Sequence, residues 1–150
     1  MTVSLWRNHC RDFSPALEEE FSAPYCKELI DAVQDDSFAV IYHNCGPNTP
    51  KMTDSLSSLG ASAYHFGDAV QLEEILDKMP SDRVVMGNIS PSKQFLGGTP
   101  DSMAQAVKEL LEKCAGHKNF LLSSGCDIPP KSSWDNIRAF FRASEEFYAE

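Results

Sequence analysis

Several features that mark common protein classes are missing from this sequence. No apolar run reaches the roughly 18 residues that a membrane-spanning helix needs, and the residues after Met1 lack the apolar segment of a signal peptide. The 13 basic residues are scattered and are outnumbered by 22 acidic residues, which gives a net charge of −9. Such a charge disfavours nucleic acid or an anionic membrane as partner. We therefore expect a cytoplasmic protein that binds neither.

The cysteines do not form the framework of a small secreted protein. They are odd in number and irregularly spaced, at Cys10, Cys26, Cys45, Cys114 and Cys126. We expect reduced thiols. Cys26 and Cys114 lie inside helical patterns, where cysteine usually acts as a small buried hydrophobic residue.

Two familiar catalytic motifs are also absent. Gly97-Gly98 is not part of a G-x-G-x-x-G sequence that follows a strand, so a dinucleotide-binding loop is not supported. The stretch 123–125 lacks the spacing of a nucleophile elbow. Serine hydrolase chemistry is therefore not expected.

What is present indicates one folded domain, residues 1–150, with 42% hydrophobic residues. Apolar runs and turn residues predict strands at 38–43, 61–66, 83–88 and 119–124. Caps, prolines and helical periodicity predict helices at 15–34, 50–59, 68–79, 99–116 and 133–147. Strands that alternate with helices in this way predict an α/β fold with parallel strands and right-handed crossovers.

The first of these helices has two notable features. Large apolar residues recur at every fourth position and give it an apolar face: Leu17, Phe21, Tyr25, Leu29 and Val33. Pro24 lies inside the pattern and predicts a kink or a break there.

Three potential metal ligands follow the predicted strands. The buried strand 38–43 runs into His43-x-Cys45, whose side chains project from one face about 6.6 Å apart along the backbone. The strand 119–124 is followed by Gly125 and Cys126. The carboxyl ends of parallel strands meet at one edge, so the three residues should converge. One imidazole and two thiols with a fourth position open are typical of catalytic zinc, although His43 and Cys45 taken alone also fit an ordinary core.

Several longer motifs resemble one known family. They are His43-Asn-Cys-Gly46, Met86-Gly-Asn-Ile-Ser-Pro91, Leu96-Gly-Gly-Thr-Pro100, Ser123-Ser-Gly-Cys-Asp-Ile-Pro-Pro130 and Asn136-Ile137. From about Phe13 to Tyr148 the sequence resembles the second half of the uroporphyrinogen decarboxylase-like superfamily. Within it, His-x-Cys followed far downstream by Gly-Cys-Asp-x-Pro resembles the methylcobamide:coenzyme M methyltransferase branch.

The resemblance implies both a fold and an activity. The fold is half of a (β/α)8 TIM-type barrel, here four parallel β/α units and an N-terminal helix. His43, Cys45 and Cys126 are expected to bind zinc, which holds a thiol substrate as its thiolate. That thiolate would attack the methyl group of a corrinoid, which is free or carried by a partner protein.

The chain departs from the family pattern after the second strand. Gly67 stands where many relatives have the first of two acidic residues, which leaves Asp68 and His65 as candidate fourth ligands. Asp68 also fits a helix N-cap, and His65 also fits a structural histidine. His65, Asn88 and Asp127 are candidate substrate-binding residues, although Asn88 also fits a strand end and Asp127 a turn.

The absent first half of the barrel keeps other functions open. In the decarboxylases of the superfamily that half holds the catalytic arginine and aspartate, so tetrapyrrole decarboxylation is the alternative activity. A non-catalytic half-barrel subunit is the third possibility. A half barrel has two unpaired edges and an uncovered interior, so we expect a homodimer or an N-terminal-half partner.

Overall fold

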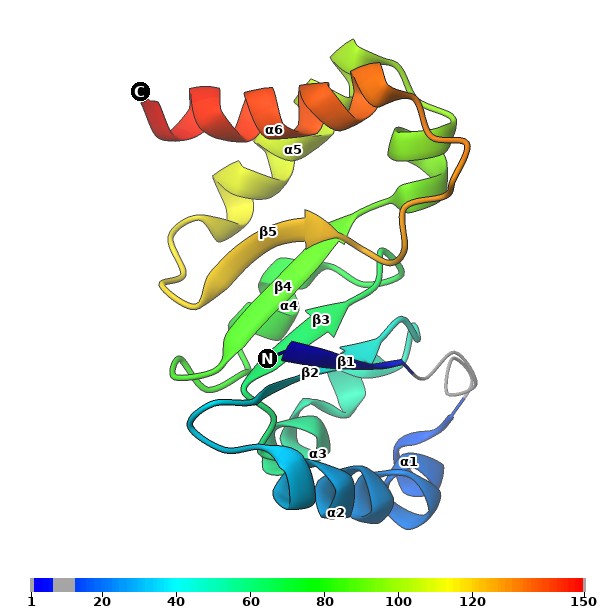
Figure 1. The fold of residues 1–150 in the computed structure, drawn as a ribbon, viewed down its shortest axis with the longest axis vertical. Coiled ribbons are helices and arrows are strands. Elements are labelled where there is room, and N and C mark those ends of the chain that lie inside the picture. Colours follow the sequence, from blue (N-terminus) through cyan, green and yellow to red (C-terminus); the bar gives the residue numbers. More distant parts are fainter. Residues whose placement is uncertain (1, 7–12, 150) are drawn as a thin grey trace.

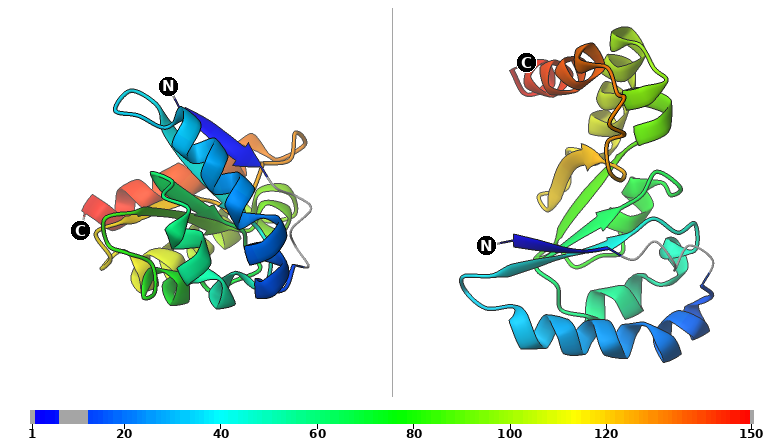
Figure 2. Two further views of the ribbon diagram at one scale, coloured as in Figure 1. Left: turned by 90° about the horizontal axis from the view of Figure 1, so that it is seen from below. Right: turned by 45° about the vertical axis from the view of Figure 1, so that its right-hand side comes forward.

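The computed structural model describes residues 2–6 and 13–149, so Cys10 lies outside the described residues. Helices flank one twisted sheet at both ends and along its back (Figures 1 and 2). The elements follow in the order β1 (Thr2–Trp6), α1 (Pro15–Phe21), α2 (Ala23–Val33), β2 (Ala39–Asn44), the short helix η2 (Thr49–Lys51), α3 (Thr53–Ser58), β3 (Ala63–Phe66), α4 (Leu72–Leu76), β4 (Val84–Ile89), the π-helical turn η3 (Pro91–Leu96), α5 (Pro100–Cys114), β5 (Phe120–Ser124) and α6 (Trp134–Ala149).

The sheet has five strands in the order β1-β2-β3-β4-β5, and all neighbours are parallel. The predicted α/β class with parallel strands is therefore confirmed. The additional strand β1 pairs with β2 and was not predicted, because residues 2–6 show neither a clear period nor a turn signal. Consecutive strands lie side by side, so the carboxyl ends of all five meet at one edge of the sheet.

Helix starts follow the capping signals where these are strong. Thr99 and Ser102 form a capping box at α5, in which each side chain accepts a hydrogen bond from the other residue's backbone N–H, at 3.2 and 2.9 Å. Ser14 accepts the Leu17 N–H at the start of α1. Asp68 is not a cap, because α4 begins at Leu72 with Gln71 in the N-cap position. That alternative for Asp68 is wrong.

The predicted first helix is two helices that meet at Ser22, with Pro24 in the first turn of the second, as its position predicted. Its apolar face is exposed. The five large apolar residues of this face are 43–60% exposed, and we call them the outer row: Leu17, Phe21, Tyr25, Leu29 and Val33. The buried positions are each one residue further along the chain: Glu18 and Ser22, then Cys26 and Ile30. Periodicity identified the spacing of the faces but not which one the protein covers.

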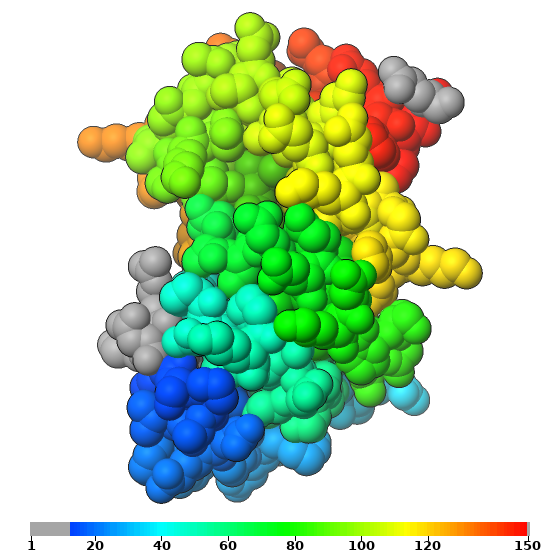
Figure 3. All heavy atoms as spheres, turned by 180° about the vertical axis from the view of Figure 1, so that it is seen from behind, coloured from blue at the N-terminus to red at the C-terminus, as the bar shows by residue number. Residues whose placement is uncertain are grey.

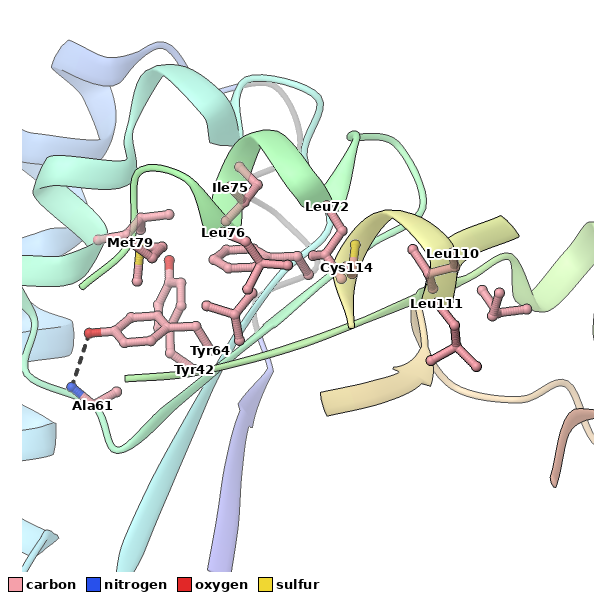
Figure 4. Packing of buried hydrophobic residues seen from close by; sticks show 14 of the residues in the cluster. Tyr42, Ala61, Tyr64, Leu72, Ile75, Leu76, Met79, Leu110, Leu111 and Cys114 are labelled. Atoms are coloured by element: carbon pink, nitrogen blue, oxygen red, sulfur yellow. Dashed lines mark hydrogen bonds between the residues drawn. The ribbon is translucent and has the colours of Figure 1, made fainter. Parts of the chain in front are cut away.

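The hydrophobic core lies between the sheet and its helices (Figure 4). Tyr42 and Tyr64 from the strands are fully buried in this cluster, which also includes Ile75 of α4 and Leu111 of α5. The Tyr64 hydroxyl accepts a hydrogen bond from the Ala61 N–H at 3.2 Å, so its polar atom is satisfied. Cys26 and Cys114 are buried free thiols, as predicted.

The opposite face of the sheet is less completely covered. Strand pairing places His43, His65, Met86 and Leu121 in one row across four strands. Val84 and Leu121 on this face are 39% and 49% exposed. We call it the open face. Within the described part of the chain, no helix combines the length and the apolar character that crossing a bilayer requires.

Candidate metal centre

The tips of β2, β3 and β5 converge because two glycines remove side chains between them. A Cβ atom on Gly67 would lie 2.6 Å from the Cβ of Cys45. A Cβ atom on Gly125 would lie 2.8 Å from the backbone nitrogen of Asp68. Real Cβ atoms do not approach so closely, so both positions need glycine for the segments to meet.

This convergence brings His43 and Cys126 into contact. The Sγ atom of Cys126 lies 3.7 Å from Nε2 of His43, although the residues are 83 positions apart in the chain. Burial raises the pKa of the Cys126 thiol, and Cys45, Asp127 and Asp68 raise it further, while a backbone hydrogen bond at Asp127 opposes them. The second thiol and both carboxylates therefore lie close enough to Cys126 to affect its charge.

His43 is held in its neutral form. Burial and, to a smaller extent, the neighbouring His65 lower the pKa of the His43 imidazole from 6.5 to about 4. Near neutral pH the ring therefore carries one proton and one lone pair. A neutral imidazole is the form that ligates metal ions.

His65 ties the two strand tips together. Its ring packs against the His43 ring in a tilted arrangement, with a centroid separation of 4.7 Å, and its Nε2 lies 2.5 Å from the carbonyl oxygen of Ser124. A carbonyl only accepts, so this nitrogen is the donor. The Ser124 hydroxyl in turn donates to the carbonyl oxygen of Cys126 at 2.7 Å. The contacts form a closed circuit from His43 through His65, Ser124 and Cys126 back to His43.

Asn88 braces the loop after β3. Its Nδ2 donates to the carbonyl oxygens of Gly67 and Val70, at 3.0 and 2.9 Å. With Asp68 and Lys93 it also lines a polar cleft of about 240 Å³ between α4 and α5. None of the three candidate zinc ligands is among the described residues that line this cleft. The structure therefore brings Asn88 to the same edge of the sheet as His43 but gives its amide nitrogen a structural role.

The donor set fits zinc in chemistry and, for two ligands, in distance. Tetrahedral zinc with bonds of about 2.3 Å to sulfur and 2.0–2.1 Å to nitrogen separates these atoms by roughly 3.6 Å, close to the observed 3.7 Å. Within residues 2–6 and 13–149, however, no three His, Cys, Asp or Glu side chains are gathered into a ready-made metal site. Binding by all three ligands would therefore require the partly buried Cys45 to shift relative to His43 and Cys126.

Sequence reasoning identified the two residues in contact but missed the groups that position them. The importance of Ser124 lies in its carbonyl group, which every residue has, so no sequence pattern signals it. Gly67 was noticed only as a missing carboxylate, while its closeness to Cys45 depends on how the strand tips meet. Asp127 and Asp68 are both exposed beside the site.

Comparison with known proteins agrees with this architecture. The family model for uroporphyrinogen decarboxylase (URO-D) matches residues 5–147. A solved methyltransferase from Methanosarcina mazei superimposes with a TM-score of 0.81 and 21% identity, covering 98% of this chain and 42% of that one. Its TIM-type barrel confirms the predicted fold class, of which this chain forms part.

Two curated relatives are similar over most of the chain. Methylcobamide:CoM methyltransferase MtbA of Methanosarcina acetivorans is 25% identical over 129 residues, which are 86% of this chain and 36% of that protein. Uroporphyrinogen decarboxylase of Synechococcus sp. (strain CC9605) is 27% identical over 146 residues, or 95% and 40%. The chain thus spans well under half the length of these relatives. It belongs to the uroporphyrinogen decarboxylase family.

Proposed function

We propose that this chain is, or forms part of, a zinc-dependent methyltransferase that moves a methyl group between a corrinoid and a thiol. The observation that carries the proposal is the 3.7 Å contact between Cys126 Sγ and His43 Nε2 at the carboxyl ends of two parallel strands. Active sites of β/α barrels lie at that end of the strands. The similarity to a methylcobamide:CoM methyltransferase supports the choice of reaction.

In this proposal His43, Cys45 and Cys126 hold the ion. The low pKa of buried His43 keeps its lone pair available at neutral pH, and the contacts of His65 and Ser124 fix the Cys126 segment against it. Asp68 is the proposed fourth ligand when no substrate is bound. Bound zinc would stabilise as a thiolate a substrate thiol whose ordinary pKa is about 8.5.

The remaining polar residues would orient the substrate. His65 and Asp127 lie beside the proposed ligands, and Asn88 lies on the neighbouring strand with Nδ2 already engaged. Its carboxamide oxygen is therefore the atom proposed to face substrate. The methyl donor is a corrinoid, either free or carried by a partner protein. The rest of the pocket would come from a second copy or from an N-terminal-half partner.

Tetrapyrrole decarboxylation is the second candidate. The family model is named for uroporphyrinogen decarboxylase, and so is a relative that aligns with 95% of this chain. Turnover of a porphyrinogen by the isolated chain would favour it. A half barrel that binds metal but supports neither reaction would instead be a non-catalytic subunit.

Metal analysis tests the proposal. Purified protein loaded with zinc and then desalted should retain about one equivalent. The Cys126→Ala variant should lose the ion, whereas Cys26→Ala, which removes a buried thiol of α2, should retain it. Equal zinc content in the two variants would refute the assignment. Methyl transfer from methylcobalamin to a thiol, measured on the same samples, then separates an enzyme from a binding module.

A further inference from the structure

Asn44 lies between His43 and Cys45 in the chain and is a buried polar residue, with 2% of its surface exposed. Its backbone is held at the tip of β2, because its carbonyl oxygen accepts a hydrogen bond from the Gly67 N–H at 3.0 Å. Beyond it the chain enters η2 and α3, which Figure 3 shows in turquoise, packed between α1 and α2 in blue and α4 in green. The turn that carries Cys45 therefore joins a strand tip to packed helices.

The side chain of Asn44 closes a turn around Cys45. Its Oδ1 accepts a hydrogen bond from the Gly46 N–H, two residues further on, at 2.8 Å. The hydroxyl of Thr49 lies 3.1 Å from the same oxygen and 2.7 Å from the carbonyl oxygen of Gly46. An asparagine that accepts from the backbone two residues on forms an Asx turn, and the residue inside this one is Cys45. Rotation of the Cys45 backbone would break the bond to Gly46.

The two ends of the Asn44 amide are used unequally. Its Nδ2 is buried and has no hydrogen-bond partner among the described residues. The opposite orientation of the amide would point this nitrogen at the Gly46 N–H, which is also a donor. A buried donor without a partner lowers stability by at least as much as one accepted hydrogen bond adds. Asn44 therefore contributes little net stability, and what it does provide is a fixed turn.

A second buried asparagine, Asn136 at the start of α6, uses its amide in the opposite way. Its Nδ2 lies 3.1, 3.2 and 2.9 Å from the carbonyl oxygens of Gln94, Phe95 and Gly98. These bonds fasten η3 to α6 and satisfy buried backbone groups, as structural asparagines do. Asn44 instead accepts bonds at a turn whose enclosed residue is a proposed metal ligand.

From these contacts we propose that Asn44 is a positioning residue, whose turn fixes the backbone of Cys45 beside the proposed metal ion. Gly67 restricts the same backbone, because a Cβ atom there would lie 2.7 Å from the Cα of Cys45. The Cys45 thiol then has only its own side-chain rotation to lose on binding, which favours three protein ligands over two. This role rests on the proposed function, since it needs Cys45 to be a ligand.

Alkylation of the metal-free protein tests the turn itself. Asn44→Leu keeps the size of the side chain but cannot accept a hydrogen bond, so Cys45 should be alkylated at least about fivefold faster than in wild type. The rate at Cys126, read from the same peptide digest, should not change. Asn136→Leu is the matched control: it should lower the melting temperature more than Asn44→Leu does and leave the rate at Cys45 unchanged. Equal rates at Cys45 in wild type and Asn44→Leu, or an equal rise in both variants, would overturn the proposal.

X-ray absorption of zinc-loaded protein tests the consequence at the metal. Wild type should show two sulfur ligands and Asn44→Leu only one, although both thiols remain in the chain. Asn44→Asp retains the accepting oxygen and should restore the second sulfur. Two sulfur ligands in Asn44→Leu would overturn the proposal. If wild type itself binds no zinc, the proposed function fails, and the alkylation rates still decide whether Asn44 fixes Cys45.

Discussion

The two faces of the sheet differ in what they contribute. The helix-covered face presents Tyr42, Tyr64 and Val85, all fully buried and packed by α4 and α5. The open face presents His43 and His65 beside partly exposed apolar residues. The covered face therefore contributes most of the buried apolar packing within this chain, while the open face carries the residues of the proposed metal site. Substitutions on the two faces should separate these contributions.

Matched leucines on either side of the sheet should give the largest contrast. Leu111→Ala on the covered face removes a side chain with no exposed area and should lower the free energy of unfolding by about 2–5 kcal/mol. Leu121→Ala on the open face, where the side chain is 49% exposed, should cost well under half as much. Urea unfolding of metal-free protein measures both. Similar losses would mean that the open face is already packed.

Acid should destabilise the metal-free protein through His43. The folded pKa of about 4 lies below the ordinary histidine value of 6.5, so the unfolded chain binds the proton first as pH falls. The stabilisation is complete above pH 6.5 and is lost as pH approaches 4, by roughly 3 kcal/mol at 1.36 kcal/mol per pKa unit. Unfolding of wild type and His43→Asn across this range isolates the effect. Parallel pH profiles would contradict it.

A methyl group between the strand tips should separate them. Gly67→Ala would force its Cβ against Cys45 and should cost about 1–3 kcal/mol, with a loss of zinc affinity. Gly116→Ala is the control, because a Cβ there meets no atom within 4 Å. Thermal unfolding and zinc titration measure the pair. Unchanged zinc binding in Gly67→Ala would show that the tips need not touch.

The smallest expected effect concerns the tie made by His65. His65→Asn removes the bond to the Ser124 carbonyl and should cost about 1 kcal/mol. The more specific readout is faster alkylation of Cys126 in metal-free protein, followed by peptide mass spectrometry. The control is His117→Asn, which changes a histidine that pairs with Asp77 away from the site and should not change that rate. An unaltered alkylation rate in His65→Asn would mean that the contact between His65 and the Ser124 carbonyl does not restrict access to Cys126.

The sequence was sufficient for the helix–strand order and for the approach of Cys126 to His43, because these depend on local periodicity and on parallel topology. It was not sufficient for β1, whose pairing is visible only once β2 is in place. It also misassigned the outer row, since spacing by four fits two adjacent helix faces and the protein buries the one that contains Glu18. The ties through the Ser124 carbonyl involve backbone atoms common to all residues.

We propose that the imidazole of His43 and the thiolates of Cys45 and Cys126 share one metal ion at the edge of the sheet. X-ray absorption at the zinc edge of the loaded protein tests it most directly. We expect a shell of two sulfur atoms at about 2.3 Å with nitrogen or oxygen completing four ligands, and loss of one sulfur in Cys45→Ala. A shell made only of nitrogen and oxygen would contradict the account.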